Sequence, residues 1–206
     1  MAQDRCNLVI AMTGGIASGK SVVERCFVAH GIHVYDADCA AREVIEPGAS
    51  GLAAVVDAFG TDILDESGRL NRHGMRQRVF ADPVARLMLE AIIHPLVRQW
   101  LHARATADLG PYCLLAIPLL AENIEHYRWV NRILVVDAPE SAQIVRLMAR
   151  DGIDETLAWR MLAHQANRAE RLALADDVIE NSGYESLLDG AVAELHQRYL
   201  ALAATT

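Results

Sequence analysis

Apolar residues form five short runs along this chain, and patterns with helical spacing fill the intervals between them. The runs cover residues 8–12, 32–35, 112–117, 133–137 and 178–179. Short apolar runs without polar alternation are typical of buried strands in a parallel sheet, and intervening helices favour βαβ units. The pattern therefore predicts an α/β fold.

The same pattern predicts helices over residues 20–30, 39–45 and 139–150, with Gly31 ending the first of them. The C-terminal segment is predicted as a helix that packs on the sheet, because its apolar residues recur at steps of four and three. These residues are Leu188, Val192, Leu195, Tyr199 and Leu202.

Between the second and third runs, the chain has almost no strand pattern. Helices are predicted over residues 52–59, 75–80 and 84–93, with a turn-rich stretch at 60–71. His94 and Pro95 are expected to end the third helix, so that Pro95 begins a new helix reaching residue 106. A simple crossover needs far fewer residues, so we expect an inserted helical lobe at about 39–109 that binds an acceptor.

A glycine-rich segment follows the first run and matches the phosphate-loop pattern Gly, four residues, Gly-Lys-Ser. Backbone N–H groups in such a loop cradle phosphates, and its glycines permit positive φ and close approach. Lys20 is expected to reach the transferred phosphate, and the Ser21 hydroxyl to coordinate Mg²⁺. The alternative is a glycine-rich turn that binds nothing. The expected ATP-binding residues are Gly14, Gly15, Ile16, Ala17, Ser18, Gly19, Lys20, Ser21 and Val22.

Lys20 is also the only lysine among the nineteen Lys and Arg residues of the chain. A compact ammonium is thus kept where a point charge belongs between phosphate oxygens, and arginine is used elsewhere. A general drift toward arginine that spared this position is the alternative explanation.

Two aspartates, Asp36 and Asp38, follow the second run, at the sheet edge where ligands of parallel α/β folds gather. Such carboxylates can orient and deprotonate an acceptor hydroxyl or hold Mg²⁺ through water. Asp38 could instead be a helix N-cap. Thr13 and His94 are further candidates for acceptor binding, although spacing alone favours a core histidine at position 94. Asp137 is a weak metal candidate.

Five arginines are expected to lie within one helical stretch and to form a lid at about 146–172. Guanidinium groups that close over a nucleotide neutralise charge on the transferring phosphoryl group and exclude water. Pairing with nearby carboxylates on a solvated face is the alternative. The arginines are Arg146, Arg150, Arg160, Arg168 and Arg171, of which Arg146 and Arg150 are the catalytic candidates.

Composition limits the class of protein. A length of 206 residues with 52% hydrophobic and 22% charged residues suits one domain with a core, and a net charge of −8 argues against a nucleic-acid partner. No apolar run is long enough to suggest a signal peptide or membrane span, so we expect a cytoplasmic protein. The cysteines lack paired spacing and are expected to be buried thiols: Cys6, Cys26, Cys39 and Cys113.

Taken together, the motifs resemble those of the dephospho-CoA kinase family, and they extend from the first strand to the last helix. The similar segments are the phosphate loop, Asp36-Ala37-Asp38, Gly68-Arg69-Leu70-Asn71-Arg72, His94-Pro95, Pro118-Leu119-Leu120-Ala121-Glu122-Asn123, residues 146–151, Gln165-Ala166-Asn167-Arg168 and Ala175-Asp176-Asp177-Val178-Ile179. Ala17 stands where the family usually has glycine, which is harmless at negative φ and strained otherwise. Val22 stands where threonine is common, which removes a hydroxyl near the nucleotide.

The resemblance implies a P-loop NTPase three-layer sandwich with a five-stranded parallel sheet, a helical acceptor-binding insertion and a mobile lid. It implies transfer of the γ-phosphate of ATP to the ribose 3′-hydroxyl of dephospho-CoA, with Mg²⁺ as cofactor and Asp38 facing the acceptor hydroxyl. A nucleoside or nucleoside-monophosphate kinase is the alternative enzyme, and a non-catalytic nucleotide-binding module is the alternative from another class. A GTP switch is excluded, because a chain whose one lysine lies in the phosphate loop has no Asn-Lys-x-Asp motif. The sequence makes no prediction of the oligomeric state.

Overall fold

The computed structural model describes residues 8–183 and 186–205. This part of the chain divides into two compact units. The sheet unit comprises the residues up to Tyr35 and those from Ala105 onward, and the helical unit comprises Asp36–Arg104. Each unit has a hydrophobic core of its own, so each is described separately.

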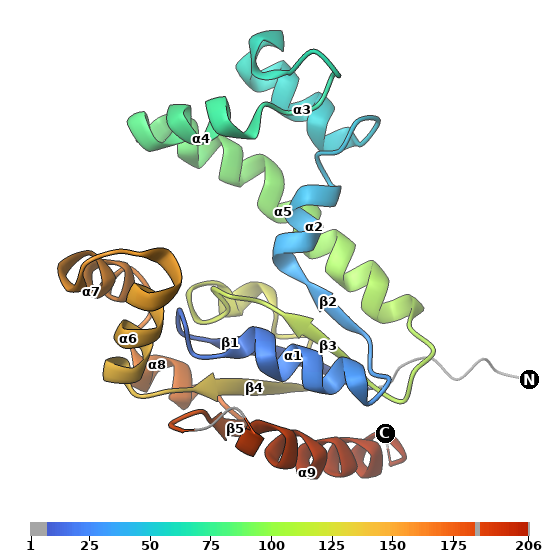
Figure 1. Ribbon diagram of the computed structural model, residues 1–206. Helices are drawn as coiled ribbons and strands as arrows, with labels where there is room; N and C mark the ends of the chain where they lie inside the picture. The colour runs from blue at the N-terminus through green and yellow to red at the C-terminus, as the bar shows by residue number, and fades with distance from the viewer. Residues whose placement is uncertain (1–7, 184–185, 206) are drawn as a thin grey trace, which may run out of the picture. The chain divides into compact units, whose positions relative to one another are not determined.

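The sheet unit is built on a five-stranded sheet with β1 (Val9–Gly14) at its centre (Figure 1). The strand order is β2-β3-β1-β4-β5, and β1 pairs in parallel with β3 and β4 while β4 pairs in parallel with β5. The remaining strands are β2 (Val34–Asp36), β3 (Cys113–Ala116), β4 (Arg132–Asp137) and β5 (Asp177–Glu180). The predicted α/β fold with a parallel sheet is confirmed, and each of the five apolar runs overlaps a strand.

Helices α1 (Lys20–Ala29) and α9 (Ser186–Ala203) pack together through aromatic rings. Phe27 of α1 stacks on Tyr199 of α9 with ring centroids 6.3 Å apart, and Tyr112 meets both rings edge-on. The predicted stripe of α9 faces this core, since Leu188, Val192 and Tyr199 are almost entirely buried.

The predicted lid arginines lie on three helices, so the expectation of one helical stretch is wrong. They belong to α6 (Glu140–Asp151), α7 (Glu155–Ala163) and α8 (Arg168–Ala173), which follow β4 in Figure 1. Gly152, with φ of 66°, ends α6 in the left-handed conformation that glycine adopts most easily. The side chains of Asp154 and Asn167 cap the starts of α7 and α8.

In the helical unit the structure contains α2 (Ala37–Glu43), α3 (Ser50–Phe59), a 3-10 turn η1 (Thr61–Ile63), α4 (Arg72–Ala81) and α5 (Pro83–Ala107). The predicted helices 52–59 and 75–80 are confirmed within α3 and α4. Figure 1 shows these helices in cyan and green. Leu52, Val55, Phe59 and Met75 form the centre of their shared core.

The predicted helix break at His94 and Pro95 is wrong, because α5 continues through Pro95. Proline removes one helical N–H donor, but its fixed φ of about −65° is itself helical. Ile92 and Ile93 pack on the core of the helical unit, and Val97 after the proline is also buried. Burial on both sides of the proline therefore offsets the lost hydrogen bond.

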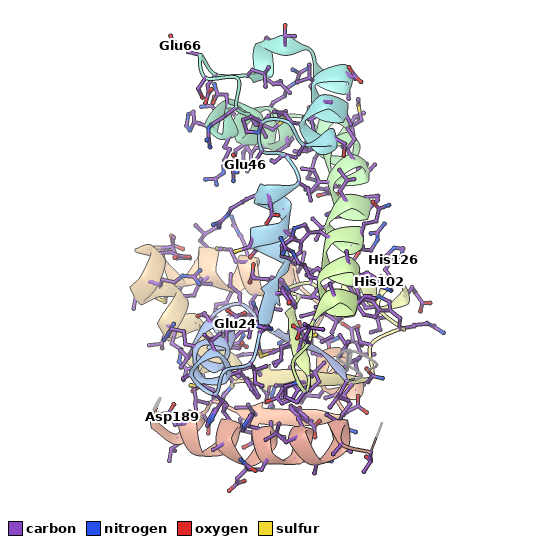
Figure 2. The ribbon with its side chains drawn as sticks, turned by 90° about the vertical axis from the view of Figure 1, so that its right-hand side faces the viewer. Glu24, Glu46, Glu66, His102, His126 and Asp189 are labelled. Atoms are coloured by element: carbon purple, nitrogen blue, oxygen red, sulfur yellow. The ribbon has the colours of Figure 1, made fainter. Side chains whose placement is uncertain are left out.

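The cysteine prediction holds for Cys113, which is buried, but not for Cys39, which is exposed. Cys26 is half-buried, and its thiol donates to a carboxylate oxygen of Asp189 on α9 at 3.0 Å. Figure 2 labels Asp189. Cys6 lies outside the described residues. In the part of the chain that is described, no helix combines the length and the apolar character needed to cross a bilayer.

Candidate active site

The glycine-rich loop connects the end of β1 to the first turn of α1. Ser18 N–H donates to the Gly15 carbonyl at 3.0 Å, and Val22 N–H donates to the Gly19 carbonyl at 2.9 Å. Within the described residues, the N–H groups of Gly19 and Ser21 make no hydrogen bond. Because unbonded N–H groups at a helix start carry partial positive charge, this end of α1 can bind an anion.

Two glycines of the loop are required by their surroundings. A Cβ on Gly15 would collide with the side chains of Gln143 and Arg171. Gly19 has φ of 96°, and a Cβ there would collide with the Asn181 amide. A Cβ at Gly15 would therefore displace the Gln143 and Arg171 side chains, and a Cβ at Gly19 would also strain the left-handed backbone.

Ala17 has φ of 56°, the one positive φ at a non-glycine position among the described residues. The sequence left open whether an alanine here would be strained, and the structure answers that it is. An alanine in the left-handed region costs about 1–2 kcal/mol relative to its preferred conformations. The surrounding contacts must offset that cost.

Lys20 and Ser21 form the first turn of α1. Lys20 Nζ lies 2.6 Å from Glu24 Oε1, one helical turn further along, with both side chains largely buried (Figure 2 labels Glu24). A bound phosphate would compete with Glu24 for this ammonium group. The Ser21 side chain is exposed, so its hydroxyl is accessible to a ligand.

The side chains near the loop can supply only part of the coordination of Mg²⁺. Among the described residues no group of three His, Cys, Asp or Glu side chains could hold a metal ion. Mg²⁺ commonly takes one or two protein oxygens and completes its octahedron with phosphates and water, which is a role that Ser21 fits. Asp137 fits poorly, because Arg168 Nη2 binds its carboxylate at 2.6 Å and Arg168 Nε binds both oxygens at 3.0 Å.

Three side-chain amides bind the backbone of the loop. Gln143 Nε2 donates to the Ile16 carbonyl at 2.6 Å, and Ile16 N–H donates to Gln165 Oε1 at 2.8 Å. Asn181 Nδ2 donates to the Ser18 carbonyl at 2.8 Å. The sequence did not identify these residues as part of the site, because they follow the loop by more than 120 positions.

Arg146 is linked to the loop through Asn181, whereas Arg150 is held by its neighbour on α6. Arg146 Nη2 donates to the Asn181 carbonyl at 3.0 Å and to Asn181 Oδ1 at 3.2 Å, and its Nη1 is buried without a partner in the described part of the chain. Arg150 instead makes two hydrogen bonds, of 2.7 and 2.8 Å, to the neighbouring Asp151. These bonds raise the pKa of Arg150 and lower the pKa of Asp151.

The other three arginines of the predicted lid differ in environment. Arg168 pairs with Asp137, whose hydrogen bonds and charge raise the pKa of the guanidinium. Arg171 is buried beneath the loop, which lowers its pKa, and its Nη1 donates to the Ala166 carbonyl. Arg160 on α7 is exposed. The pairing of Arg150 with the exposed Asp151 is the kind of contact that the solvated-face alternative expects.

The candidate acceptor residues Asp36, Asp38 and His94 all belong to the helical unit. Asp36, rather than Asp38, is the N-cap of α2, since its side chain accepts from Cys39 N–H at 2.8 Å. The Asp38 carboxylate is exposed in the first turn of α2 and has no partner among the described residues. His94 is exposed on α5, so the alternative of a core histidine is wrong.

Thr13 belongs to the sheet unit and is buried at the end of β1. Its hydroxyl donates to the Pro118 carbonyl at 3.3 Å, just beyond β3. The hydroxyl therefore links the ends of two neighbouring strands.

Comparison with known proteins gives one consistent result. A family model described as dephospho-CoA kinase matches residues 8–186. The dephospho-CoA kinase of Aeromonas hydrophila is 47% identical over 196 residues, which are 95% of this chain and 96% of that protein. The dephospho-CoA kinase of Escherichia coli is 44% identical over 195 residues, or 95% of this chain and 94% of that protein.

Solved structures agree with this fold. A crystal structure of a Thermus thermophilus protein superposes with a TM-score of 0.75 at 31% identity and covers 96% of this chain and 98% of its own. A dephospho-CoA kinase from Campylobacter jejuni gives a TM-score of 0.66 at 24% identity, covering 93% and 96%. A shikimate kinase from Acinetobacter baumannii gives 0.53 at 17% identity, covering 95% and 94%, a likeness of fold alone.

Proposed function

This chain belongs to the dephospho-CoA kinase family, and on that premise we propose how its residues carry out the family's reaction. The reaction transfers the γ-phosphate of ATP to the ribose 3′-hydroxyl of dephospho-CoA, giving CoA and ADP as the last step of CoA synthesis. The observation that carries this function is the family match, which spans residues 8–186 and thus both units.

The loop between β1 and α1 binds the phosphates of ATP in this proposal. The unbonded N–H groups of Gly19 and Ser21 would donate to phosphate oxygens. Lys20 would leave Glu24 and bind the transferred phosphate. Ser21 would contribute one oxygen ligand to Mg²⁺, which when bound supplies charge neutralisation between the phosphates.

Asp38 is the proposed partner of the acceptor hydroxyl, and its exposed, unpartnered carboxylate supports this choice over the capping Asp36. The carboxylate would orient the 3′-hydroxyl and accept its proton. A bond then forms between the 3′ oxygen and the γ-phosphorus as the bond to the bridging oxygen of ADP breaks, without a phosphoenzyme. Thr13 and His94 are proposed as further acceptor contacts.

Arg146 and Arg150 of the lid segment, residues 146–172, are proposed to neutralise the charge on the transferring phosphoryl group. The buried, unpartnered Nη1 of Arg146 leaves a donor for a ligand. Arg150 is held by an exposed Asp151, so it would exchange that carboxylate for phosphate. The helical insertion, at about 39–109, is proposed to bind the rest of dephospho-CoA.

The proposed partners are ATP and dephospho-CoA, without nucleic acid or membrane. We place the reaction in the cytoplasm. Cys26, Cys39 and Cys113 are present as thiols in the described part of the chain, which suits a reducing compartment.

ADP release from Mg-ATP in the presence of dephospho-CoA tests this function. Parallel reactions contain AMP, CMP, adenosine or no acceptor. We expect release with dephospho-CoA alone. Release with a nucleotide or nucleoside instead would point to the alternative kinase class. If none of these reactions released ADP, a nucleotide-binding module would be left as the interpretation.

Asp38→Asn tests the proposed acceptor carboxylate. Because an amide cannot accept the hydroxyl proton, we expect kcat to fall by about 10²–10³-fold with an unchanged melting temperature. Asp36→Asn is the matched control, since asparagine is an equally good N-cap and should cost far less activity. A larger loss in Asp36→Asn would exchange the two roles.

A further inference from the structure

Ile16 is bound at both polar atoms of its backbone by glutamines from two different segments. Gln143 on α6 donates to the carbonyl, and Gln165, between α7 and α8, accepts from the N–H. Gln143 is completely buried, so its hydrogen bond is shielded from water. Ile16 is thus fixed in both directions immediately before the strained Ala17.

Gln165 is itself held in place through the residue that follows it. Ala166 N–H donates to Glu122 Oε1 at 2.8 Å, and the Ala166 carbonyl accepts from Arg171 Nη1. Arg171 is buried and also lies against Gly15 of the loop. Both backbone polar groups of Ala166 are therefore bound, which holds the neighbouring Gln165 in place.

We propose that Gln165 is a positioning residue that sets the phosphate loop for ATP through the Ile16 N–H. The bond holds the peptide before Ala17, so the left-handed conformation of Ala17 persists and the N–H groups after it stay directed at the phosphates. A loop that is already in its binding conformation loses less entropy when the ligand arrives. The proposal rests on the proposed function in one respect, that the loop binds ATP.

A consequence is that the segment between α7 and α8 and the nucleotide are thermodynamically linked. If the Gln165 bond favours nucleotide binding, bound nucleotide must favour that bond by the same free energy. Glu122 and Arg171 both hold this segment, and Arg171 also contacts Gly15. Both residues would therefore influence nucleotide binding without contacting the phosphates.

Two variants separate the hydrogen bond from the bulk of the side chain. Gln165→Met keeps the length and removes the acceptor, whereas Gln165→Glu keeps an acceptor for the Ile16 N–H. Gln197→Met is the matched control, because Gln197 is exposed on α9 and has no hydrogen bond in the described part of the chain.

The first readout is hydrogen exchange of the Ile16 amide, followed by NMR in the nucleotide-free protein. We expect protection in the unmodified protein, in Gln165→Glu and in Gln197→Met, and faster exchange in Gln165→Met. The second readout is kinetic. Gln165→Met should raise the KM for ATP and the Kd for a fluorescent ADP analogue by about five- to tenfold, the usual value of one hydrogen bond.

The split between substrates distinguishes positioning from general damage, since the KM for dephospho-CoA should stay unchanged in Gln165→Met. Unchanged Ile16 protection, or unchanged nucleotide affinity, in that variant overturns the proposal. So does an equal rise in both KM values. If the unmodified protein failed to phosphorylate dephospho-CoA while Gln165→Met still weakened the ADP analogue, the proposed function would fail and the positioning role would stand.

Discussion

Ala17 adopts a left-handed conformation that costs free energy, and hydrogen bonds to the adjacent residues of the loop offset that cost. The residue sits at φ of 56° in a loop whose peptides are held by Gln143, Gln165 and Asn181. These three amides bind the loop on either side of Ala17, so they can keep it in a conformation that alanine avoids. Backbone strain at a ligand-binding loop is thus accompanied here by identifiable hydrogen bonds.

Ala17→Gly should therefore stabilise the protein. Glycine adopts positive φ without steric cost, although it also adds entropy to the unfolded chain. We expect a net gain of about 0.5–1 kcal/mol, which is roughly 1–4 °C in melting temperature for a chain of this size.

Thermal unfolding measures this change. Ala103→Gly is the control of opposite sign, because Ala103 is exposed within α5 and glycine in a helix costs about 1 kcal/mol. Destabilisation by both substitutions to a similar extent would show that Ala17 is not strained.

Residue patterns identified the loop but not what surrounds it. The glycine spacing and Lys20 are local signals, so the sequence was sufficient to locate them. Gln143, Gln165 and Asn181 reach the loop from distant positions. Gln165 belongs to a segment similar to the family's, but nothing in that pattern indicates that its side chain binds the loop. The capping alternative was placed at Asp38 because the helix was expected to begin at residue 39, whereas α2 begins at Ala37 and is capped by Asp36.

At the level of helices and strands, the predictions succeeded where a short apolar run marks a strand and failed where local rules compete with packing. All five strands were found because each is a short apolar run. Pro95 was taken as a boundary by a local rule, but burial before and after it keeps α5 continuous. The lid arginines were assigned to one stretch, although Gly152, Asp154 and Asn167 each mark an end or a start within it.

At the scale of the whole molecule, we expect the free energy of unfolding to depend on pH through His196 of α9. His196 of α9 is buried, its Nδ1 lies 2.8 Å from the Tyr112 hydroxyl, and its ring stacks on His30 with centroids 4.6 Å apart. Burial, and then the neighbouring His30, lower the pKa of His196 below its ordinary 6.5. Tyr112 adds no charge, since burial raises its pKa.

The free energy of unfolding should consequently decrease as the pH falls below about 6.5. The unfolded chain binds a proton at His196 near that pH, whereas the folded chain binds it only at lower pH. In this interval the unfolded state holds more protons, so acidification favours it, and the loss ends below the folded pKa.

Urea unfolding between about pH 5 and 8 measures this dependence. In His196→Gln the amide can still bond Tyr112 but cannot titrate, so the stability should vary less with pH than in the unmodified protein. Parallel curves for the two proteins would assign the pH dependence to other groups.

The single lysine of the chain lies in the first turn of α1, and this gives the molecule an unusual property toward proteases. A lysine-specific protease has one peptide bond to cleave, between Lys20 and Ser21. That bond lies in the first turn of α1, and a protease needs an extended segment around it, so it is cut only when the loop and the start of α1 open. The rate of limited digestion by such a protease therefore measures how often one segment, the phosphate loop with the start of α1, opens in the native chain.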